Sequence, residues 1–295
     1  MAAESLIDVR GAIDLHLHAA PSLFPRLATD GEVAEAASQA GLTAILLKCH
    51  HESTVDRARL LDPEFAGLRV FGGIVLNSYV DGIDPHAVEA ALDRGAKQVW
   101  LPTIDAAHHA RVHGGTGGFD AQSAQLARRE MAGIDLLREG ELTPELDAVL
   151  GLVAAHDAIL GTAHQSYEEL RLIIPAARRA GVAKILLTHP FFKTPGLSLE
   201  QTQELVTLGA IAEFTYCTVS PMWAYASLPS VAEAIKMLGA ENCILTSDAG
   251  QRHNPMPPEA LRIFAQSLFE LDIPADDIDV MIRRNPARLL DLQPS

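Results

Sequence analysis

Ala12-Ile13-Asp14-Leu15-His16-Leu17-His18 is the stretch that decides the fold. Its apolar run predicts a buried strand, and it ends in two histidines spaced two residues apart. Because side chains on a strand alternate between faces, His16 and His18 point the same way and converge on one point. Two converging imidazoles are half of a transition-metal site, the alternative being a pair of core or surface histidines. A metal site would need further ligands from distant parts of the chain.

Composition narrows the class of protein. The chain has 295 residues, of which 48% are hydrophobic and 21% charged, so it can bury a sizeable core, and we expect one domain over residues 1–295. Its net charge is −15 with no basic run, which argues against nucleic acid or an anionic membrane surface as a partner. The sequence also predicts no signal peptide and no membrane span. Three cysteines without a Cys-x-x-Cys spacing favour the cytoplasm.

Short apolar runs alternate with amphipathic stretches along most of the chain. Eight strand–helix units in series predict a parallel sheet, and eight is the number that closes a (β/α)₈ TIM barrel. An open doubly wound sheet is the structural alternative, but the first strand is not followed by its Gly-x-Gly-x-x-Gly turn. The expected strands are residues 12–18, 43–49, 70–77, 98–103, 158–162, 183–188, 210–216 and 243–246.

Two segments depart from this alternation. Residues 106–132 contain several histidines and two Gly-Gly pairs, and we expect a mobile lid inserted after strand four. A small hairpin around residues 138–140 follows it. Residues 275–284 and 286–290 are expected to form a C-terminal helical tail.

The polar residues fall where a barrel carries its active site, at the carboxyl ends of the strands. Strand one ends in His16 and His18. Four more of these strands end in Lys48, His164, His189 and Asp248. Further candidates at the mouth are Arg26, His50, Asn77, Glu213, Gln251 and His253, with Arg26 placed to pair with a substrate carboxylate. We interpret His86, His156, His108 and His109 as ordinary helix or lid residues.

The chain resembles the amidohydrolase superfamily of metal-dependent barrel hydrolases, specifically a poorly characterised branch of it. The resemblance covers essentially the whole chain and depends on the ordered set of His-x-His, His, His and Asp on strands one, five, six and eight. It implies that the metal ligands are His16, His18, His164, His189 and Asp248, with Asp248 also accepting the proton of the attacking water. We expect His16, His18, His164 and Asp248 to share one metal.

There is one departure from the superfamily pattern. Binuclear members bridge their metals through a carboxylated lysine or a glutamate on strand four, and strand four has neither residue here. Lys48, at the end of strand two, is expected either to become carboxylated and bridge two metals or to hold substrate as an ammonium. The number of metals, one or two, therefore stays open.

The expected activity is hydrolysis of an amide, cyclic amide, ester or lactone of a small molecule. The cofactor would be a divalent metal, zinc in the first place, with manganese or iron as alternatives. The catalytic residues would be Asp248, His189 and Lys48. The alternatives are a metal-dependent decarboxylase-type lyase on a mononuclear site and a non-enzymatic metal-binding protein. We also expect a homo-oligomer.

Overall fold

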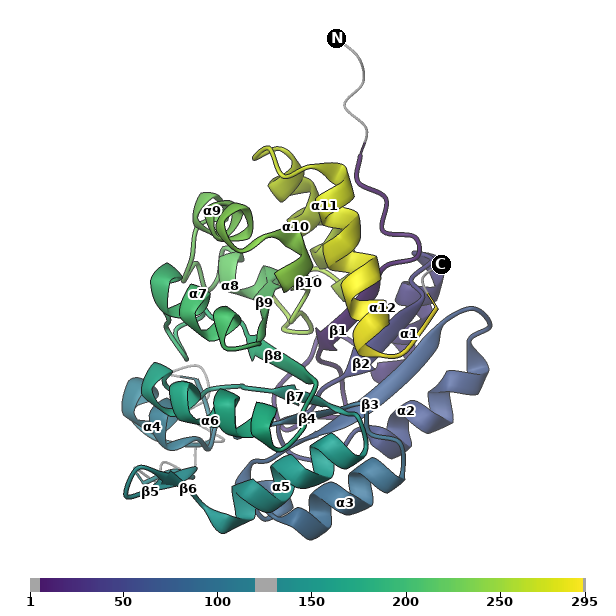
Figure 1. The fold of residues 1–295 in the computed structure, drawn as a ribbon. Coiled ribbons are helices and arrows are strands. Elements are labelled where there is room, and N and C mark those ends of the chain that lie inside the picture. The colour runs from purple at the N-terminus through teal and green to yellow at the C-terminus, as the bar shows by residue number, and fades with distance from the viewer. Residues whose placement is uncertain (1–5, 120–131, 294–295) are drawn as a thin grey trace.

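The computed structural model describes residues 6–119 and 132–293, in which eight parallel strands are surrounded by helices (Figure 1). The strands neighbour one another in the order β1-β2-β3-β4-β7-β8-β9-β10, as expected for the predicted TIM barrel. A separate two-stranded hairpin, β5 and β6, forms where the sequence predicted one. The bounds are β1 Ile13–Leu17, β2 Ala44–Leu47, β3 Arg69–Val75, β4 Gln98–Trp100, β5 Leu137–Arg138, β6 Glu141–Leu142, β7 Ile159–Gly161, β8 Lys184–Thr188, β9 Ile211–Thr215 and β10 Cys243–Thr246.

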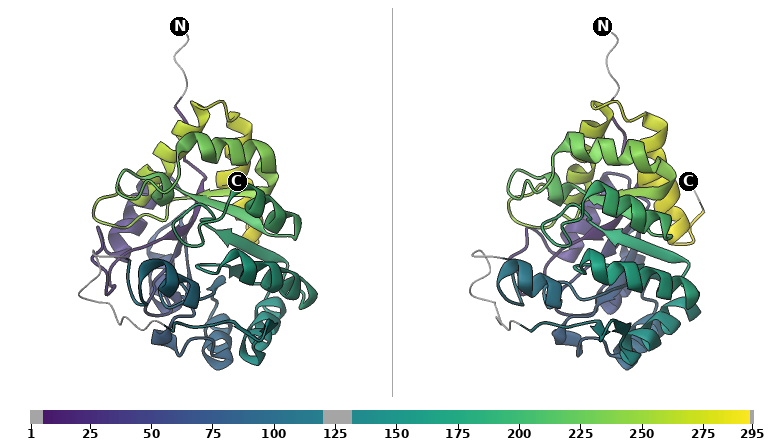
Figure 2. Two further views of the ribbon diagram at one scale, coloured as in Figure 1. Left: turned by 90° about the vertical axis from the view of Figure 1, so that its left-hand side faces the viewer. Right: turned by 60° about the vertical axis from the view of Figure 1, so that its left-hand side comes forward.

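The helices pack around the outside of the barrel, as two further views show (Figure 2). They are α1 Asp30–Gln39, α2 Val55–Leu61, α3 Pro85–Asp93, α4 Ala107–His113, α5 Pro144–Ala155, α6 Tyr167–Arg179, α7 Leu199–Thr207, α8 Tyr216–Val219, α9 Leu228–Leu238, α10 Pro257–Phe269, α11 Ala275–Asp279 and α12 Asn285–Leu289. Short 3₁₀ turns cover Asp62–Glu64, Ser78–Val80 and Ala240–Asn242, and a π-helical turn, Val280–Arg284, joins α11 to α12. None of the described helices is long and apolar enough to cross a bilayer.

The helix starts follow from local chemistry. Thr29, Ser166 and Ser198 each begin a helix with a capping box. Each of these side chains accepts a hydrogen bond from the backbone N–H three residues later, and the side chain of that later residue accepts one from the backbone N–H of the cap residue. These capping boxes satisfy N–H groups that the first helical turn leaves without partners. They fix the point at which three of the outer helices begin.

The expected irregular lid over 106–132 differs from the structure in its first part. Residues 107–113 form α4, a helix that ends at Gly114 in a left-handed conformation. The apolar side of this short helix is carried by alanines, so its periodicity is faint in the sequence. Residues 120–131 of the predicted lid lie outside the described residues.

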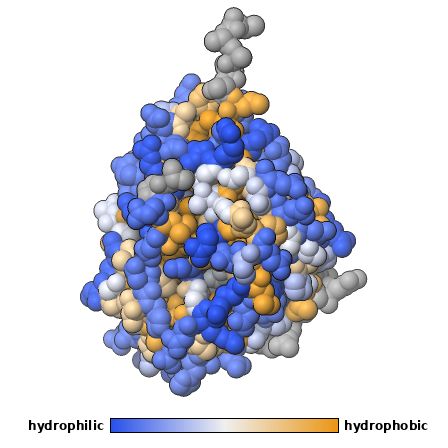
Figure 3. All heavy atoms as spheres, turned by 90° about the vertical axis from the view of Figure 1, so that its right-hand side faces the viewer, coloured by the Kyte–Doolittle hydropathy of each residue, from blue (hydrophilic) through white to orange (hydrophobic). Residues whose placement is uncertain are grey.

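The barrel interior is packed around Trp100 on β4, which is fully buried. Glycines on the two neighbouring strands make room for its ring: a Cβ on Gly161 would lie 2.4 Å from Trp100 Cδ1, and one on Gly73 would lie 2.7 Å from Trp100 Cζ3. The outside is different in character. Figure 3 shows a mainly hydrophilic face on the side of α1 and α2, with apolar residues scattered in small groups.

The barrel closes between its first and last strands. The Asp248 N–H donates to the His16 carbonyl at 2.7 Å, and the His18 N–H donates to the Ala249 carbonyl at 2.8 Å. Buried Asp14 reinforces this seam, because its Oδ1 accepts from the N–H groups of Ser247 and His16. The seam therefore joins the two strand ends that carry three of the predicted metal ligands, His16, His18 and Asp248.

Candidate metal centre

The seam between β1 and β10 brings three donor side chains together. His16 Nε2 and His18 Nε2 lie 3.1 and 3.2 Å from Asp248 Oδ1, and all three side chains are almost fully buried. One ligand atom from each lies within 4.8 Å of the others. This spacing suits three donors around one cation whose bonds to nitrogen and oxygen are about 2.0–2.2 Å long. We call His16, His18 and Asp248 the donor triad.

The Nδ1 atom of each triad histidine already forms a hydrogen bond. His16 Nδ1 lies 2.8 Å from Glu213 Oε1, and His18 Nδ1 lies 2.9 Å from the Lys48 carbonyl oxygen. Carboxylate and carbonyl oxygens only accept hydrogen bonds, so both histidines carry a proton on Nδ1. Outer partners of this kind orient metal-binding histidines and fix their tautomer. The Nε2 atoms are left as the metal-binding atoms, so the donor set fits a divalent ion.

The electrostatics at His16 also favour positive charge. Burial alone lowers the pKa of His16, yet Asp248 and Glu213 together raise it to about 9. For Asp248 burial acts in the opposite direction, but His16 and His18 hold its pKa well below the ordinary value. Two ionised carboxylates thus flank one imidazole, and they stabilise either a proton or a metal ion there.

Lys48 competes for the same nitrogen. Its side chain is buried and its Nζ lies 3.0 Å from His16 Nε2, the atom through which His16 would bind a metal. Burial lowers the pKa of Lys48 to about 8. Lys48 must give up this contact when His16 binds an ion. The amine is near enough to the donor triad for either of the predicted roles, a carboxylated ligand or an ammonium.

We expected His164 to share a metal with the donor triad, but in the structure it lies apart from these three residues and contacts another histidine. The residues that lie close enough to act together are His16, His18 and Asp248, among the described ones. His164 Nδ1 instead lies 2.9 Å from His109 Nδ1, and His109 Nε2 lies 3.0 Å from the Gly118 carbonyl. His109 must donate to that carbonyl, so its Nδ1 accepts a proton from His164. His164 is thereby left with an unprotonated Nε2.

His109 lies in a helix within the lid segment, consistent with the expectation of a helix or lid residue, but it also contacts a residue of the site, a role that the sequence analysis did not give it. His109 is fully buried, stacks on His164 with ring centroids 5.0 Å apart, and sets its tautomer. Sequence reasoning missed it because α4 was not expected. The His108-His109 pair was the available signal, since only one residue of such a pair can face inward from a helix.

His189 forms the neighbouring part of the site. Its ring centroid lies 5.2 Å from that of His164 and 5.9 Å from that of His16, and its buried Nδ1 has no hydrogen-bond partner among the described residues. Burial lowers its pKa to about 4. His189 and Asp248 both follow strands with φ angles of 29° and 46°, in the left-handed region. Non-glycine residues held there are frequent at functional sites.

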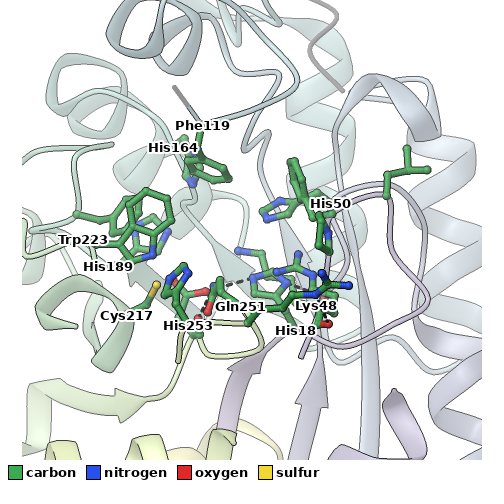
Figure 4. Close-up of a pocket in the computed structure, with 17 residues that line it drawn as sticks. His18, Lys48, His50, Phe119, His164, His189, Cys217, Trp223, Gln251 and His253 are labelled. Atoms are coloured by element: carbon green, nitrogen blue, oxygen red, sulfur yellow. Dashed lines mark hydrogen bonds and ion pairs between the residues drawn. The ribbon is translucent and has the colours of Figure 1, made fainter. Parts of the chain in front are cut away.

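A cavity of about 370 Å³ opens beside these groups (Figure 4). His18, Lys48, His164, His189 and Asp248 line it. Its other walls include four aromatic rings that the sequence analysis did not single out, Phe24, Phe119, Phe192 and Trp223. Isolated aromatic residues in loops gave no periodic signal by which they could have been recognised.

The remaining predicted substrate-binding residues divide into two groups. Arg26, His50, His253 and Gln251 line the cavity. Asn77 and Glu213 are not part of its wall. Asn77 bonds to Thr103 and to the His50 carbonyl and so supports His50, while Glu213 lies behind His16. Their expected contact with substrate is replaced by a role in holding other side chains.

Comparison with solved structures confirms the predicted TIM barrel. The TatD homologue YjjV from Escherichia coli K12 is 21% identical, covers 97% of this chain and 100% of its own, and has a TM-score of 0.60. An amidohydrolase from Pseudomonas aeruginosa is 12% identical over 95% of each chain, with a TM-score of 0.59. The phosphotriesterase homology protein from Escherichia coli is 14% identical over 96% of this chain and 99% of its own, also with a TM-score of 0.59.

Sequence comparison gives the family. No curated protein matches this sequence. Residues 11–213 match a family model described as a family of unknown function, DUF6282, and this stretch is more than half of the chain. It includes His16, His18, His164 and His189 and ends at Glu213. The protein belongs to the DUF6282 family.

Proposed function

We propose that this protein is a metal-dependent hydrolase that cleaves an amide, cyclic amide, ester or lactone bond of a small molecule. The observation that carries the proposal is the donor triad, in which His16, His18 and Asp248 converge at the edge of a cavity while Glu213 and the Lys48 carbonyl orient the imidazoles. The barrel is shared with solved hydrolases and homologues of hydrolases, which supports the same class of chemistry.

A divalent ion bound by the triad, zinc in the first place, supplies Lewis acidity that polarises a carbonyl group and makes water a stronger nucleophile. The chain's own residues move the protons. Asp248 keeps an ionised carboxylate beside the cavity and can accept a proton at its oxygen. His164 and His189 are neutral near pH 7 because burial lowers the pKa of both, so each offers one unprotonated ring nitrogen to a ligand or to a hydrogen-bond donor of the substrate.

Lys48 is proposed to take part through its buried amine. Carboxylation would turn it into an anionic ligand near His16, whereas the free amine can only withdraw from His16 Nε2 and face the substrate. Both roles are compatible with its place in the cavity wall.

A lyase of decarboxylase type is the second candidate. It is favoured by the small number of described donors that converge, three, and by Trp100 on β4, the strand on which binuclear relatives would carry a bridging residue. Both observations suit a single metal. Release of carbon dioxide from a carboxylic acid substrate separates a lyase from a hydrolase.

The test measures metal and activity together. Purified protein should contain a divalent metal by elemental analysis, and chelation should abolish hydrolysis of a panel of esters, lactones and amides until metal is restored. His16→Ala should lose both metal and activity, while His156→Ala, an exposed histidine on another face, should lose neither. Full metal occupancy in His16→Ala would remove His16 from the metal site, and metal-independent hydrolysis would overturn the proposal.

A further inference from the structure

Arg26 is a half-buried cation to which no described residue supplies a counter-ion. Its Nε and Nη2 atoms are shielded from solvent and have no hydrogen-bond partner among residues 6–119 and 132–293. Asp248, the carboxylate that lines the same cavity, is engaged by His16 and His18. None of the carboxylates in residues 6–119 and 132–293 forms an ion pair with Arg26. An unpaired buried charge is costly, so its retention calls for a ligand that pairs with it.

The backbone holds Arg26 firmly at the cavity. Arg26 pairs with Gln251 in an isolated antiparallel bridge, and the Leu27 N–H donates to the Gly250 carbonyl at 2.9 Å. These bonds fasten the loop after β1 to the loop after β10, next to Asp248. The guanidinium therefore belongs to the wall that also carries the donor triad, rather than to a loose surface loop.

The charge of the cavity wall is opposite to that of the whole protein. The chain has a net charge of −15, yet among the described residues the charged ones that line the cavity are Arg26, Lys48 and Arg252 against Asp248. A bound divalent ion would add further positive charge. A wall with this excess attracts an anionic ligand.

The shape of the free guanidinium edge narrows the kind of anion. Nε and Nη2 lie side by side on the guanidinium plane, and this two-nitrogen edge matches the two oxygens of a carboxylate. Arginine has a flexible side chain, so a rotation within the cavity wall can present this edge to a ligand. The same edge can also bind a phosphate group. Phosphate sites commonly add a series of backbone N–H groups, however, and no glycine-rich phosphate cradle follows any of the expected strands here, so the carboxylate is favoured.

The aromatic rings that line the cavity indicate the chemical character of the rest of the ligand. Phe24 lies with its ring centroid 5.6 Å from Arg26 Cζ and 6.1 Å from that of Phe119, and the Phe119 ring lies 6.1 Å from Trp223. A continuous row of rings thus runs from the guanidinium across the cavity. Such a surface favours a flat apolar body.

Building on the proposed function, we infer that the substrate is a small carboxylic acid with an aromatic or other flat apolar body, whose carboxylate is bound by Arg26. The bond to be cleaved then lies over the donor triad, while the carboxylate stays at Arg26 and does not react. Arg26 is a specificity-determining residue in this arrangement.

The test compares acids with their neutral amides as probes. Benzoate, phenylacetate and 3-phenylpropionate are titrated calorimetrically into the metal-loaded protein, beside benzamide, phenylacetamide and 3-phenylpropionamide. At least one acid should bind at least ~10-fold more tightly than its amide, the size of effect expected for a charge-assisted bidentate contact. Arg26→Gln should remove this preference and leave amide binding unchanged. Arg252→Gln, which removes an exposed cation from the same cavity wall, should retain it.

The thermal stability of the ligand-free protein distinguishes a ligand-binding arginine from a purely structural one. Because Arg26 is unpaired, Arg26→Gln should raise the melting temperature of the ligand-free protein, whereas loss of a structural arginine would lower it. Three results would overturn the inference. The first is that none of the three acids binds more tightly than its amide. The second is that Arg26→Gln leaves the preference for acids intact, which would mean that the carboxylates bind the metal. The third is that Arg252→Gln abolishes the preference for acids as completely as Arg26→Gln does. Arg26→Lys keeps the positive charge but loses the two side-by-side N–H donors of the guanidinium, so it should retain only part of the preference for acids over amides.

The two proposals fail in different ways. Binding and melting need no turnover, so the acid preference survives even if the protein hydrolyses nothing. If instead the hydrolase proposal is right and this inference is wrong, Arg26→Gln still hydrolyses its substrates at the wild-type rate.

Discussion

At the scale of single residues, the site is built from hydrogen bonds that fix which imidazole nitrogen carries the proton. Glu213 and the Lys48 carbonyl do this for His16 and His18, and His109 does it for His164. These partners come from strands and helices far apart in the chain. The histidines of the donor triad are conspicuous in the sequence because they share a strand end. Glu213 and Lys48 were also recognised as candidates at the strand ends, but nothing in the sequence showed that they orient these histidines.

His109 offers a prediction at this scale. In ¹⁵N NMR spectra of the imidazole rings, His164 should carry its proton on Nδ1, because His109 Nδ1 accepts it at 2.9 Å. His109→Phe removes the acceptor and should lower activity by roughly 10- to 100-fold, the usual effect of losing a partner that orients a site histidine. His109→Gln keeps an acceptor oxygen and should restore part of the activity and the Nδ1 tautomer.

His156→Gln is the matched control for these variants, since His156 is exposed and pairs with Asp93 on another part of the surface. It should leave the His164 resonances and the activity unchanged. A His164 ring protonated on Nε2 in the wild-type protein would contradict the assignment of the hydrogen-bond chain.

At the scale of elements, the sequence predicted the structure that hydrophobic periodicity controls. All eight barrel strands appear near their expected bounds, as does the hairpin at β5–β6. It could not predict α4, whose buried face combines two alanines with His109 and His113 and so shows no clear apolar periodicity, or the way α4 delivers His109 to His164. Which aromatic loop residues line the cavity depends on how loops fold over the barrel, and this is set by long-range packing that a single sequence does not display.

The packing of β4 against its neighbours gives a prediction for elements. A Cβ at Gly161 on β7 would lie 2.4 Å from Trp100 Cδ1 on β4, and neither buried strand has room to move aside. Gly161→Ala should therefore lower the free energy of unfolding by roughly 1–3 kcal/mol, the usual cost of overpacking. Trp100→Leu makes space for the methyl group, so in the double variant the two effects should be clearly non-additive.

Denaturant titration of the two single variants and the double variant measures this coupling. Gly151→Ala is the control, because a Cβ at Gly151 in α5 meets nothing within 4 Å and alanine has the higher helix propensity. It should hold or raise stability. Simple additivity of Gly161→Ala and Trp100→Leu would show that the two positions are not in steric conflict.

At the scale of the whole molecule, the barrel concentrates buried, uncharged histidines in one place. Burial holds the pKa of His50 and His164 well below 6.5 and lowers that of His189 to about 4. In the unfolded chain each would take up a proton near pH 6.5. The architecture that makes the site thus also makes folding sensitive to acid.

The last prediction concerns this sensitivity in the metal-free protein. The unfolded state binds more protons than the folded state below pH 6.5, so stability should fall as the pH is lowered from about 6.5 to about 4. His189 alone accounts for a change in the free energy of unfolding on the order of 3 kcal/mol over this window.

His189→Gln removes that titration, and the urea midpoint of this variant should fall less steeply as the pH is lowered than that of the wild type. His156→Gln should not flatten the profile, because hydrogen bonds to the Leu152 carbonyl and Asp93 raise the pKa of His156. An unaltered slope in His189→Gln would show that His189 titrates normally in the folded protein.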